Sequence, residues 1–308
     1  MRINKPQFWQ EKFSPYPVLL SPLTFLYFSV LKVKNFFTRQ KKFKIPIICV
    51  GNIYVGGTGK TPLVLKIAQE INKKFKPAII KKFYKNHLDE HELIRSKFKS
   101  LYLNSDRSKA ITEAEKKKFK TVILDDGFQD YSIKKDLNIL CFNTNQLIGN
   151  GWIFPSGPLR EKFENIKKAN IIVINGDKND QFEEKIFNIS KNIKIFYSKY
   201  KPVNLNKFKN KKILAFAGIG NPDNFFNTLI ENNLDVIKTL SYPDHYSFNE
   251  SELQKIISMS KKEKLEIVTT EKDYYRIRKF KMKKIKFIKV KLEIFKNDDF
   301  IKQIKKKL

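Results

Sequence analysis

The first residues that could do chemistry form a glycine-rich segment near the start of the chain. Residues 51–60 read GNIYVGGTGK, Thr61 follows them, and the apolar run IPIICV precedes them at 45–50. Glycines let a loop wrap its amide groups around phosphate oxygens, and a helix that begins there points the positive end of its dipole at the same anion. Lys60 would contact the β- and γ-phosphates, and the Thr61 hydroxyl would bind Mg²⁺. The pattern predicts a strand, a phosphate-binding loop and a helix, with a nucleoside triphosphate as ligand.

This loop departs at one position from the strict pattern G-x-x-x-x-G-K-[ST], because Tyr54 stands where the pattern has its first glycine. Gly56 and Gly57 supply the flexibility instead. An ordinary glycine-rich turn would explain the glycines but not a Lys-Thr pair that opens an amphipathic helix. We therefore predict that the nucleotide contacts Tyr54, Val55, Gly56, Gly57, Thr58, Gly59, Lys60 and Thr61.

Two adjacent acids could hold the metal ion. Asp125 and Asp126 end the apolar run VIL at 122–124, which places both carboxylates at the carboxyl end of a predicted strand, on the edge where the phosphate loop also lies. Mg²⁺ prefers oxygen ligands and is shared with nucleotide phosphates. A simple turn before Gly127 is the alternative interpretation, but the nearby phosphate loop favours a magnesium site. Its predicted ligands are Thr61, Asp125 and Asp126.

Other candidate residues lie in predicted loops. His245 belongs to the segment PDHY at 243–246, and its spacing alone connects it to no site. Arg160 lies in the segment GNGWIFPSGPLRE at 149–161, which is dense in glycine and proline. A loop of this kind is more often functional than not. Arg160 could bind a phosphate, although by itself it would be interpreted as a solvated surface residue.

The elements that must position these residues alternate between short β-rich runs and polar helical stretches. Strands are predicted at 45–50, 78–80, 100–103, 121–124, 137–142 and 171–174, and more weakly at 195–197. A second α/β unit follows, with strands at 213–217 and 265–268 and helices that begin after Pro222, Asn249 and Thr270. The predicted fold class is α/β, a P-loop NTPase-like, mostly parallel sheet with a second, smaller α/β domain. The predicted segments are an N-terminal helical segment at 1–44, a P-loop kinase domain at 45–205 and a C-terminal α/β domain at 206–308.

The composition limits which class of protein this chain can be and which kind of partner it can bind. The chain has 308 residues, enough for two domains, and 41% of them are hydrophobic, which excludes a disordered chain. Its formal net charge of +31 favours an acidic partner such as nucleic acid, an anionic membrane or a phosphorylated substrate. Abundant lysine, isoleucine and asparagine are equally typical of AT-rich coding, so the charge could be solvated surface. Cys49 and Cys141 lie in apolar runs, which indicates buried thiols in a reducing compartment.

An apolar segment near the N-terminus indicates contact with a membrane surface. Residues 17–31 read PVLLSPLTFLYFSVL, and six basic residues follow within 32–44. As a helix this run spans about 22 Å, less than the roughly 30 Å of a bilayer core. Apolar residues recur at helical spacing, and Pro22 marks the first turn or a kink. We predict an amphipathic helix that lies in the interface of an anionic membrane, with packing on the protein's own core as the alternative.

The assembled segments resemble the tetraacyldisaccharide 4′-kinase family, the lipid A 4′-kinases of Gram-negative bacteria. The resemblance rests on six segments in the family's order: VGNIYVGGTGKTP (50–62), DDGFQD (125–130), GNGWIFPSGPLRE (149–161), AFAGIGNP (215–222), YPDHYSF (242–248) and TTEKD (269–273). It implies transfer of the γ-phosphate of ATP to the 4′-hydroxyl of a tetraacyldisaccharide 1-phosphate at the cytoplasmic face of the inner membrane. It also implies two α/β/α domains, with ATP and Mg²⁺ as cofactors and no nucleic-acid partner. We expect a monomer.

The resemblance also assigns roles to individual residues. Asp89 would be the general base, His245 its partner, and Lys60 a third catalytic residue, while Glu90, Arg160 and Glu161 would line the nucleotide site. Because Asp89 and His245 fall in different predicted domains, domain closure is expected to precede chemistry. The chain departs from the family at Asp130, where a histidine is usual, at 81–86, which are less glycine-rich, and at His91, which replaces a proline.

Two other functions are compatible with the residues alone. One is a P-loop kinase or ligase of a soluble metabolite, whose N-terminal helix belongs to the core. The other is a basic nucleotide-dependent nucleic-acid binder, although the sequence has no recognition motif and no regular aromatic platform for bases.

Overall fold

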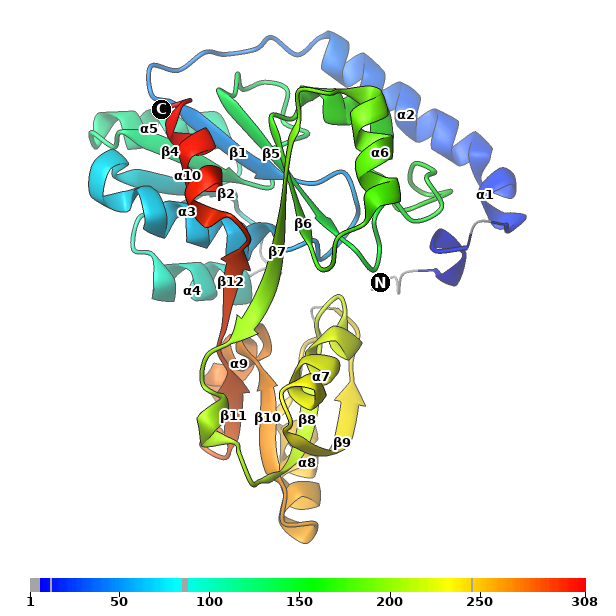
Figure 1. Ribbon diagram of the computed structural model, residues 1–308, viewed down its shortest axis with the longest axis vertical. Coiled ribbons are helices and arrows are strands. Elements are labelled where there is room, and N and C mark those ends of the chain that lie inside the picture. The colour runs from blue at the N-terminus through cyan, green and yellow to red at the C-terminus, as the bar shows by residue number, and fades with distance from the viewer. Residues whose placement is uncertain (1–5, 12, 85–87, 245) are drawn as a thin grey trace. The chain divides into compact units, whose positions relative to one another are not determined.

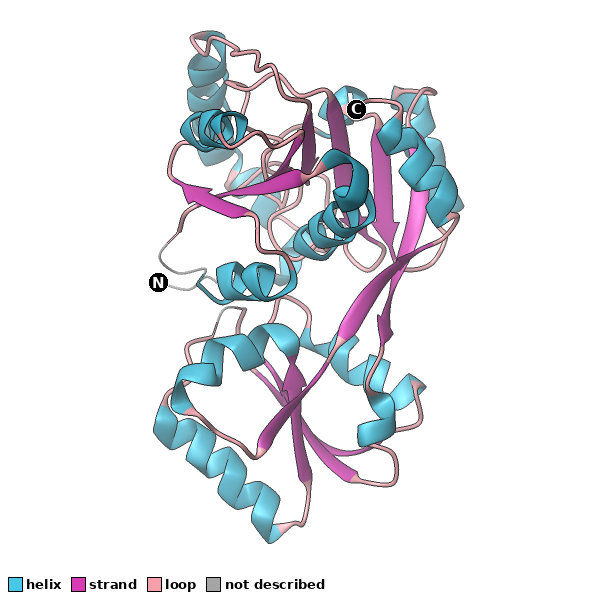
Figure 2. Ribbon diagram, turned by 90° about the vertical axis from the view of Figure 1, so that its left-hand side faces the viewer, coloured by secondary structure: helices cyan, strands magenta, loops and turns pink. Residues whose placement is uncertain are grey.

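A computed structural model describes residues 6–11, 13–84, 88–244 and 246–308. It contains an eight-stranded sheet in the order β12-β7-β6-β5-β1-β4-β2-β3 and a four-stranded sheet in the order β11-β10-β8-β9 (Figures 1 and 2). The pairings from β7 to β3 in the larger sheet, and all those of the smaller sheet, are parallel. The predicted α/β class and P-loop NTPase-like architecture are confirmed.

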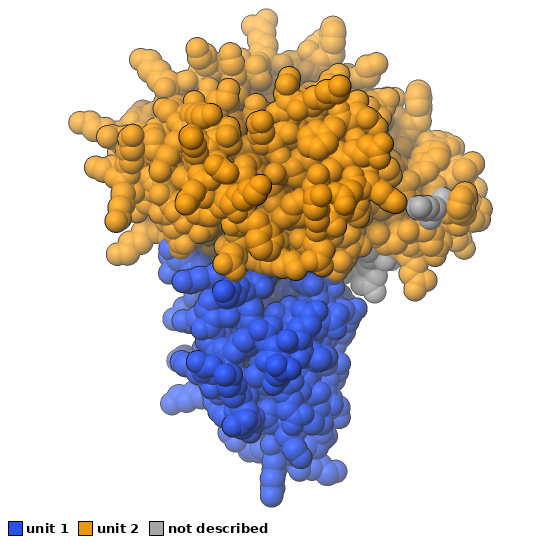
Figure 3. All heavy atoms as spheres, viewed as in Figure 1, with its two compact units in different colours: residues 1–4, 84–97, 200–291 blue, residues 5–83, 98–199, 292–308 orange. Residues whose placement is uncertain are grey.

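The chain divides into two compact units, coloured separately in Figure 3. Unit 2 contains Lys5–Phe83, Phe98–Lys199 and Leu292–Leu308, and the described part of unit 1 lies within Tyr84–Lys97 and Tyr200–Lys291. The helices of unit 2 are α1 (Tyr16–Leu19), α2 (Ser21–Phe36), α3 (Lys60–Phe75), α5 (Arg107–Lys116), α6 (Asp180–Ile189) and α10 (Asn297–Lys305). Its strands are β1 (Ile47–Gly51), β2 (Pro77–Lys82), β3 (Leu101–Asn104), β4 (Thr121–Asp125), β5 (Leu137–Asn143) and β6 (Ile171–Asn175). Strand β7 (Lys194–Pro202) and strand β12 (Val290–Ile294) each span a boundary between the units.

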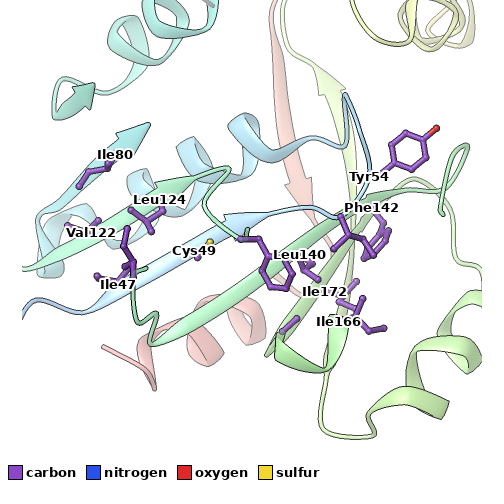
Figure 4. Close-up of a cluster of buried hydrophobic side chains, with 14 of the residues drawn as sticks. Ile47, Cys49, Tyr54, Ile80, Val122, Leu124, Leu140, Phe142, Ile166 and Ile172 are labelled. Carbon is purple, nitrogen blue, oxygen red and sulfur yellow. The ribbon is translucent and has the colours of Figure 1, made fainter. Parts of the chain in front are cut away.

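The central strands of unit 2 are mostly apolar and are buried along their whole length. All five residues of β1, β4 and β6 are buried, the pattern of parallel strands that are covered on both faces. Ile47 and Cys49 of β1 belong to one core cluster (Figure 4). The same cluster includes residues of α5 and α6. Both cysteines are free and buried, as expected, and burial raises the pKa of the Cys49 thiol to about 11 and that of Cys141 to about 12.

Unit 1 has three layers. Its strands are β8 (Lys212–Ala217), β9 (Asp235–Ser241), β10 (Glu266–Thr270) and β11 (Ile285–Ile288), and its helices are α4 (Leu88–Lys97), α7 (Pro222–Glu231), α8 (Glu250–Lys262) and α9 (Glu271–Ile277). Alternate residues of β8 enter different cores, since Ala215 packs with α7 whereas Phe216 packs with α8 and α9. The helix starts after Asn249 and Thr270 were predicted correctly, whereas α7 begins at Pro222 itself, slightly earlier than predicted. Asn249 forms a capping box with Glu252, and the Thr270 side chain caps α9.

The division into units differs from the predicted domains 1–44, 45–205 and 206–308 in three places. Helix α4 belongs to unit 1 because it packs on α9. Residues 292–308 belong to unit 2 because β12 lies beside β7 and α10 packs on α3. The described residues before 45 are part of unit 2 as well. The expected placement of Asp89 and His245 in different domains was therefore wrong, since α4 and the residues that flank His245 belong to one unit.

Helix α2 shows how the N-terminal segment meets unit 2. The Thr24 hydroxyl donates to Ser156 Oγ at 2.7 Å, and the Tyr27 ring packs edge-on against Phe154, with 5.7 Å between centroids. Pro22 lies in the first turn, as predicted. The other side of the helix exposes large apolar side chains: Leu23, Phe25, Leu26, Val30, Val33 and Phe36. Among the described residues, no helix is both long enough and apolar enough to cross a membrane.

Candidate nucleotide and magnesium site

The glycine-rich loop connects β1 to α3, and its backbone explains why Tyr54 is tolerated. Gly56 and Gly59 have positive φ values of 106° and 89°, which favour glycine, whereas Tyr54 is not among the residues with positive φ. The Tyr54 side chain is fully buried and lies at one edge of the hydrophobic core cluster (Figure 4). Gln10 Nε2 donates to its hydroxyl at 2.6 Å, and burial raises its pKa to about 12. Tyr54 therefore anchors the first part of the loop to the core cluster and to Gln10.

Asn52, which no sequence pattern indicates, stabilises the conformation of this loop. Asn52 is buried, and its Nδ2 donates to the Tyr54 carbonyl at 2.6 Å and to the Thr58 hydroxyl at 2.9 Å. The Val55 amide donates to the Pro158 carbonyl at 2.8 Å. A Cβ added at Gly57 would meet no atom within 4 Å, so the backbone is open to a ligand there. The loop is thus preorganised by its own hydrogen bonds.

The structure brings two of the three predicted metal ligands together. Strands β1 and β4 are neighbours, so Thr61 at the start of α3 meets Asp125 at the end of β4. The Thr61 hydroxyl donates to Asp125 Oδ2 at 3.0 Å. Asp125 Oδ1 is buried and has no hydrogen-bond partner among the described residues. An unused carboxylate oxygen beside a threonine hydroxyl suits Mg²⁺, which takes few protein ligands and completes its shell with phosphate and water. These residues therefore fit the ion.

Asp126 is held by cations. Arg160 Nη1 donates to its two carboxylate oxygens at 2.9 and 3.0 Å, and Lys60 Nζ lies 3.6 Å from Oδ1. Burial alone would raise the pKa of Asp126, but Lys60 and Arg160 outweigh it and hold the pKa well below the usual range. The carboxylate is therefore ionised at every physiological pH. Lys60 and Arg160, the two predicted phosphate-binding cations, meet at this one acid.

Asp130, which replaces the family's usual histidine, supports this arrangement through Arg107. Arg107 Nη1 donates to Asp130 Oδ2 at 3.1 Å, and Nη2 donates to the Asp126 carbonyl at 2.7 Å. Asp126 has a left-handed backbone, with φ of 59°, so its position depends on such contacts. Burial would raise the pKa of Asp130, whereas the hydrogen bond from Ser132 and the charge of Arg107 lower it.

Glu161 lies behind the phosphate loop. Its carboxylate is buried and accepts hydrogen bonds from Gln129 Nε2, the Tyr131 hydroxyl and Asn165 Nδ2, each at 2.7 Å. Gln129 Nε2 also donates to the Asn52 carbonyl at 2.8 Å. These contacts connect Glu161 to the loop through Gln129, which the sequence argument did not single out.

The most unexpected neighbour of the predicted metal site is Lys81. Its Nζ donates to Asp125 Oδ2 at 2.6 Å, and the two side chains are only 8% and 0% exposed. Strand β2 pairs with β4, with Lys81 opposite Asp125. Residues 81–86 are where the chain departs from the family's glycine-rich stretch. A fixed cation therefore lies beside Asp125, the acid predicted to hold the metal ion.

We predict that Lys81→Met destabilises the protein by about 3–5 kcal/mol, because it leaves the buried Asp125 carboxylate without its counter-ion. Urea denaturation measures the change. Lys66→Met is the matched control, since Lys66 pairs with Glu70 on an exposed helix surface, where such pairs contribute about 0.5 kcal/mol or less. Equal effects of the two variants would contradict the prediction.

The remaining predicted site residues belong to unit 1. The backbone of Asp89 lies in the first turn of α4, but its side chain is outside the described part of the structure, as is His245. The side chain of Glu90 lies within the described part of the structure. Its Oε1 forms an ion pair with Lys272 Nζ at 3.0 Å.

Comparison with known proteins identifies the family. The family model described as tetraacyldisaccharide-1-P 4′-kinase (LpxK) matches residues 16–308. A tetraacyldisaccharide 4′-kinase of Pelagibacter ubique is 41% identical over 302 residues, covering 96% of this chain and 95% of that protein. One of Bartonella henselae is 30% identical, with 92% and 88% covered. The crystal structure of LpxK from Aquifex aeolicus superimposes with a TM-score of 0.73 and 24% identity, covering 94% of this chain and 99% of that one. The chain, matched along nearly its whole length, thus belongs to the tetraacyldisaccharide-1-P 4′-kinase family.

Proposed function

We propose that this protein transfers the γ-phosphate of ATP to the 4′-hydroxyl of a tetraacyldisaccharide 1-phosphate, a step in lipid A synthesis. The observation that carries the proposal is the junction of β1, α3 and β4. There a preorganised glycine-rich loop leads into Lys60 and Thr61, and the Thr61 hydroxyl meets the partly unsatisfied Asp125 carboxylate. Family membership supplies the acceptor class.

In this proposal, the residues of unit 2 bind the triphosphate. The amides of the loop surround phosphate oxygens, Lys60 contacts the β- and γ-phosphates, and Thr61 and Asp125 hold Mg²⁺. When bound, the ion would offset negative charge on the transferring group. Arg160 can exchange its contact with Asp126 for a phosphate oxygen because both acceptors are anions. Asp126 thus keeps two phosphate-binding cations in place before the nucleotide arrives.

The acceptor side of the reaction uses residues of unit 1. A sugar hydroxyl is a weak nucleophile, so a base must accept its proton as the bond to phosphorus forms. We assign that role to Asp89 and assign to His245 the orientation of Asp89. The phosphate loop belongs to unit 2 and the proposed base to unit 1, and we propose that a domain movement precedes chemistry.

The direct test is to incubate the purified protein with labelled ATP, Mg²⁺ and a tetraacyldisaccharide 1-phosphate dispersed in detergent. The expected product is a lipid that carries phosphates at both ends of the disaccharide. Labelling of a soluble sugar or metabolite, with none of the lipid, would favour a soluble-substrate kinase instead. ATP hydrolysis without transfer to any acceptor would overturn the proposal.

We also propose that helix α2 binds the cytoplasmic face of the inner membrane. One side of the helix contacts the rest of unit 2, and the other exposes apolar side chains that recur every three or four residues: Leu23, Leu26, Val30 and Val33. A contiguous exposed apolar surface marks an interaction site. Six exposed basic residues follow, namely Lys32, Lys34, Arg39, Lys41, Lys42 and Lys44, each contributing about 1 kcal/mol near anionic lipid.

We predict that Leu26→Glu with Val30→Glu lowers affinity for phosphatidylglycerol-containing vesicles at least about tenfold, because each apolar side chain contributes roughly 1.5–3 kcal/mol when buried. Co-sedimentation with vesicles measures the loss. Phe187→Glu is the control, since Phe187 is exposed on α6 in the same unit, and its vesicle binding should stay near wild type. Wild-type vesicle binding by the α2 variant would show that the helix does not insert.

A further inference from the structure

The segment TTEKD at 269–273 is unused by the proposed reaction, yet it lies at a structural junction of unit 1. It spans the end of β10 and the first turn of α9. Asp273 is fully buried and accepts hydrogen bonds from the Gly218 amide at 2.9 Å, the Thr270 hydroxyl at 2.7 Å and Arg276 Nη1 at 2.7 Å. The start of α9 is thereby fixed rigidly to the sheet.

Two side chains at this fixed point hold helix α4 at its opposite ends. Glu271 Oε2 pairs with Lys97 Nζ at 2.5 Å at the last residue of α4, and Lys272 Nζ pairs with Glu90 Oε1 at 3.0 Å in its first turn. Helices α4 and α9 also pack against each other. The first turn of α4, which carries Asp89, is therefore held in place by α9. Helix α9 is in turn fixed to the sheet.

Lys272 also reaches the loop that contains His245. Its Nζ lies 3.8 Å from Asp244 Oδ1. Elsewhere the loop is anchored by Arg276 Nη1, which donates to the Tyr246 carbonyl at 3.2 Å, and by packing of Tyr242, Tyr246 and Phe248, whose ring centroids lie 4.9–5.0 Å apart. One ammonium thus contacts both the residue after Asp89 and the residue before His245.

We propose that Lys272 is a positioning residue for the phosphoryl transfer, and that the ion pairs of Lys272 with Glu90 and Asp244, here called the Lys272 bridge, hold the first turn of α4 and the residues that flank His245 in place. This inference rests on the catalytic roles proposed above. It also gives Glu90 a part in holding α4. The bridge is partly exposed, with Lys272 at 21%, so it adds little to global stability. A misplacement of 1 Å at a reacting group, however, slows an enzyme about 100-fold.

The test compares Lys272→Met, which keeps the aliphatic stem but removes the charge, with Lys272→Arg, which keeps the charge. Steady-state kinetics and hydrogen exchange of peptides covering 84–97 and 242–249 are measured on the full chain. For Lys272→Met we expect kcat to fall about 10- to 100-fold with little change in the KM for ATP, and both peptides to exchange faster. Lys272→Arg should recover most of the kcat and of the protection.

Lys97→Met is the matched control, because it removes the ion pair at the far end of α4. It should speed exchange at that end and leave kcat near wild type. Asp244→Asn breaks only the longer contact of the bridge, so it should speed exchange in 242–249 alone. It also provides a second variant if Lys272→Met unfolds.

Two results would overturn the proposal. One is wild-type kcat in Lys272→Met, and the other is a reduced kcat with unchanged exchange, which would mean that Lys272 acts on the reactants directly. Asp89→Asn and His245→Ala are assayed alongside. If both turn over at the wild-type rate, the proposed catalytic roles fail, while the exchange of the two peptides still decides whether Lys272 holds them.

Discussion

Asp125→Asn is expected to reduce Mg²⁺-dependent phosphoryl transfer about 10³-fold. Among the described residues, Oδ1 of the buried carboxylate has no partner, whereas Oδ2 accepts hydrogen bonds from the Thr61 hydroxyl and from Lys81 Nζ. Asparagine keeps the shape but removes the charge that attracts the cation, and a bound metal ion supplies several kcal/mol of transition-state stabilisation. Each 1.36 kcal/mol corresponds to a tenfold change in rate. The substituted site should also need a higher Mg²⁺ concentration for half-maximal rate.

The measurement is the initial rate of transfer to the lipid as a function of Mg²⁺ concentration. Asp136→Asn is the control, because Asp136 Oδ2 accepts the Ile47 amide at 2.8 Å at the opposite, amino end of β1. That variant should keep the wild-type magnesium dependence. If Asp125→Asn keeps it too, the metal ligand must be assigned to another acid, with Asp126 the first candidate.

Asp89→Asn is expected to lower kcat by about 10²–10⁴-fold, the usual contribution of a general base. Asparagine cannot accept the proton of the 4′-hydroxyl, whereas the KM for ATP should change little because the triphosphate binds in unit 2. His245→Ala should also reduce kcat, but less, because it removes only the orientation of the base.

Pre-steady-state measurement of a single turnover separates the chemical step from product release. Glu92→Gln provides the control, since Glu92 is an exposed acid on the same helix α4. Wild-type single-turnover rates for Asp89→Asn would refute the assignment of the base. A loss of ATP affinity without a loss of rate would place Asp89 in nucleotide binding instead.

The positions in the fold of the residues proposed to bind the nucleotide could be predicted well from the sequence because their signals are local. Lys60 and Thr61 directly follow the loop, and Asp125 ends an apolar run. The position of each residue along its strand or helix could therefore be predicted. The principle that parallel strands end at a common edge then placed Thr61 near Asp125. The helix starts at Asn249 and Thr270 were predictable for the same reason, since a cap is a contact within a few residues.

Contacts between distant segments were not predictable in this way. Asn52 and Gln129 are polar residues without a distinctive pattern, and only the folded loop shows that they hold it. Strand β9 was missed because its alternate residues are exposed and its sequence, DVIKTLS, is short and mixed. Likewise α10 joins unit 2 through packing on α3, a contact between residues more than 200 positions apart.

The sequence by itself determined the α/β class, the glycine-rich loop between a strand and a helix, the position of Asp125 at a strand end and the family, because these depend on residue types at short, fixed spacings. Only the tertiary structure shows that Lys81 forms an ion pair with Asp125 and that helix α4 packs on α9. It also shows that Arg107, itself bound to Asp130, donates a hydrogen bond to the Asp126 carbonyl. The physical reason is that ion pairs and helix packing are set by which strands become neighbours and which faces are buried. Those are properties of the whole chain, and no single segment encodes them.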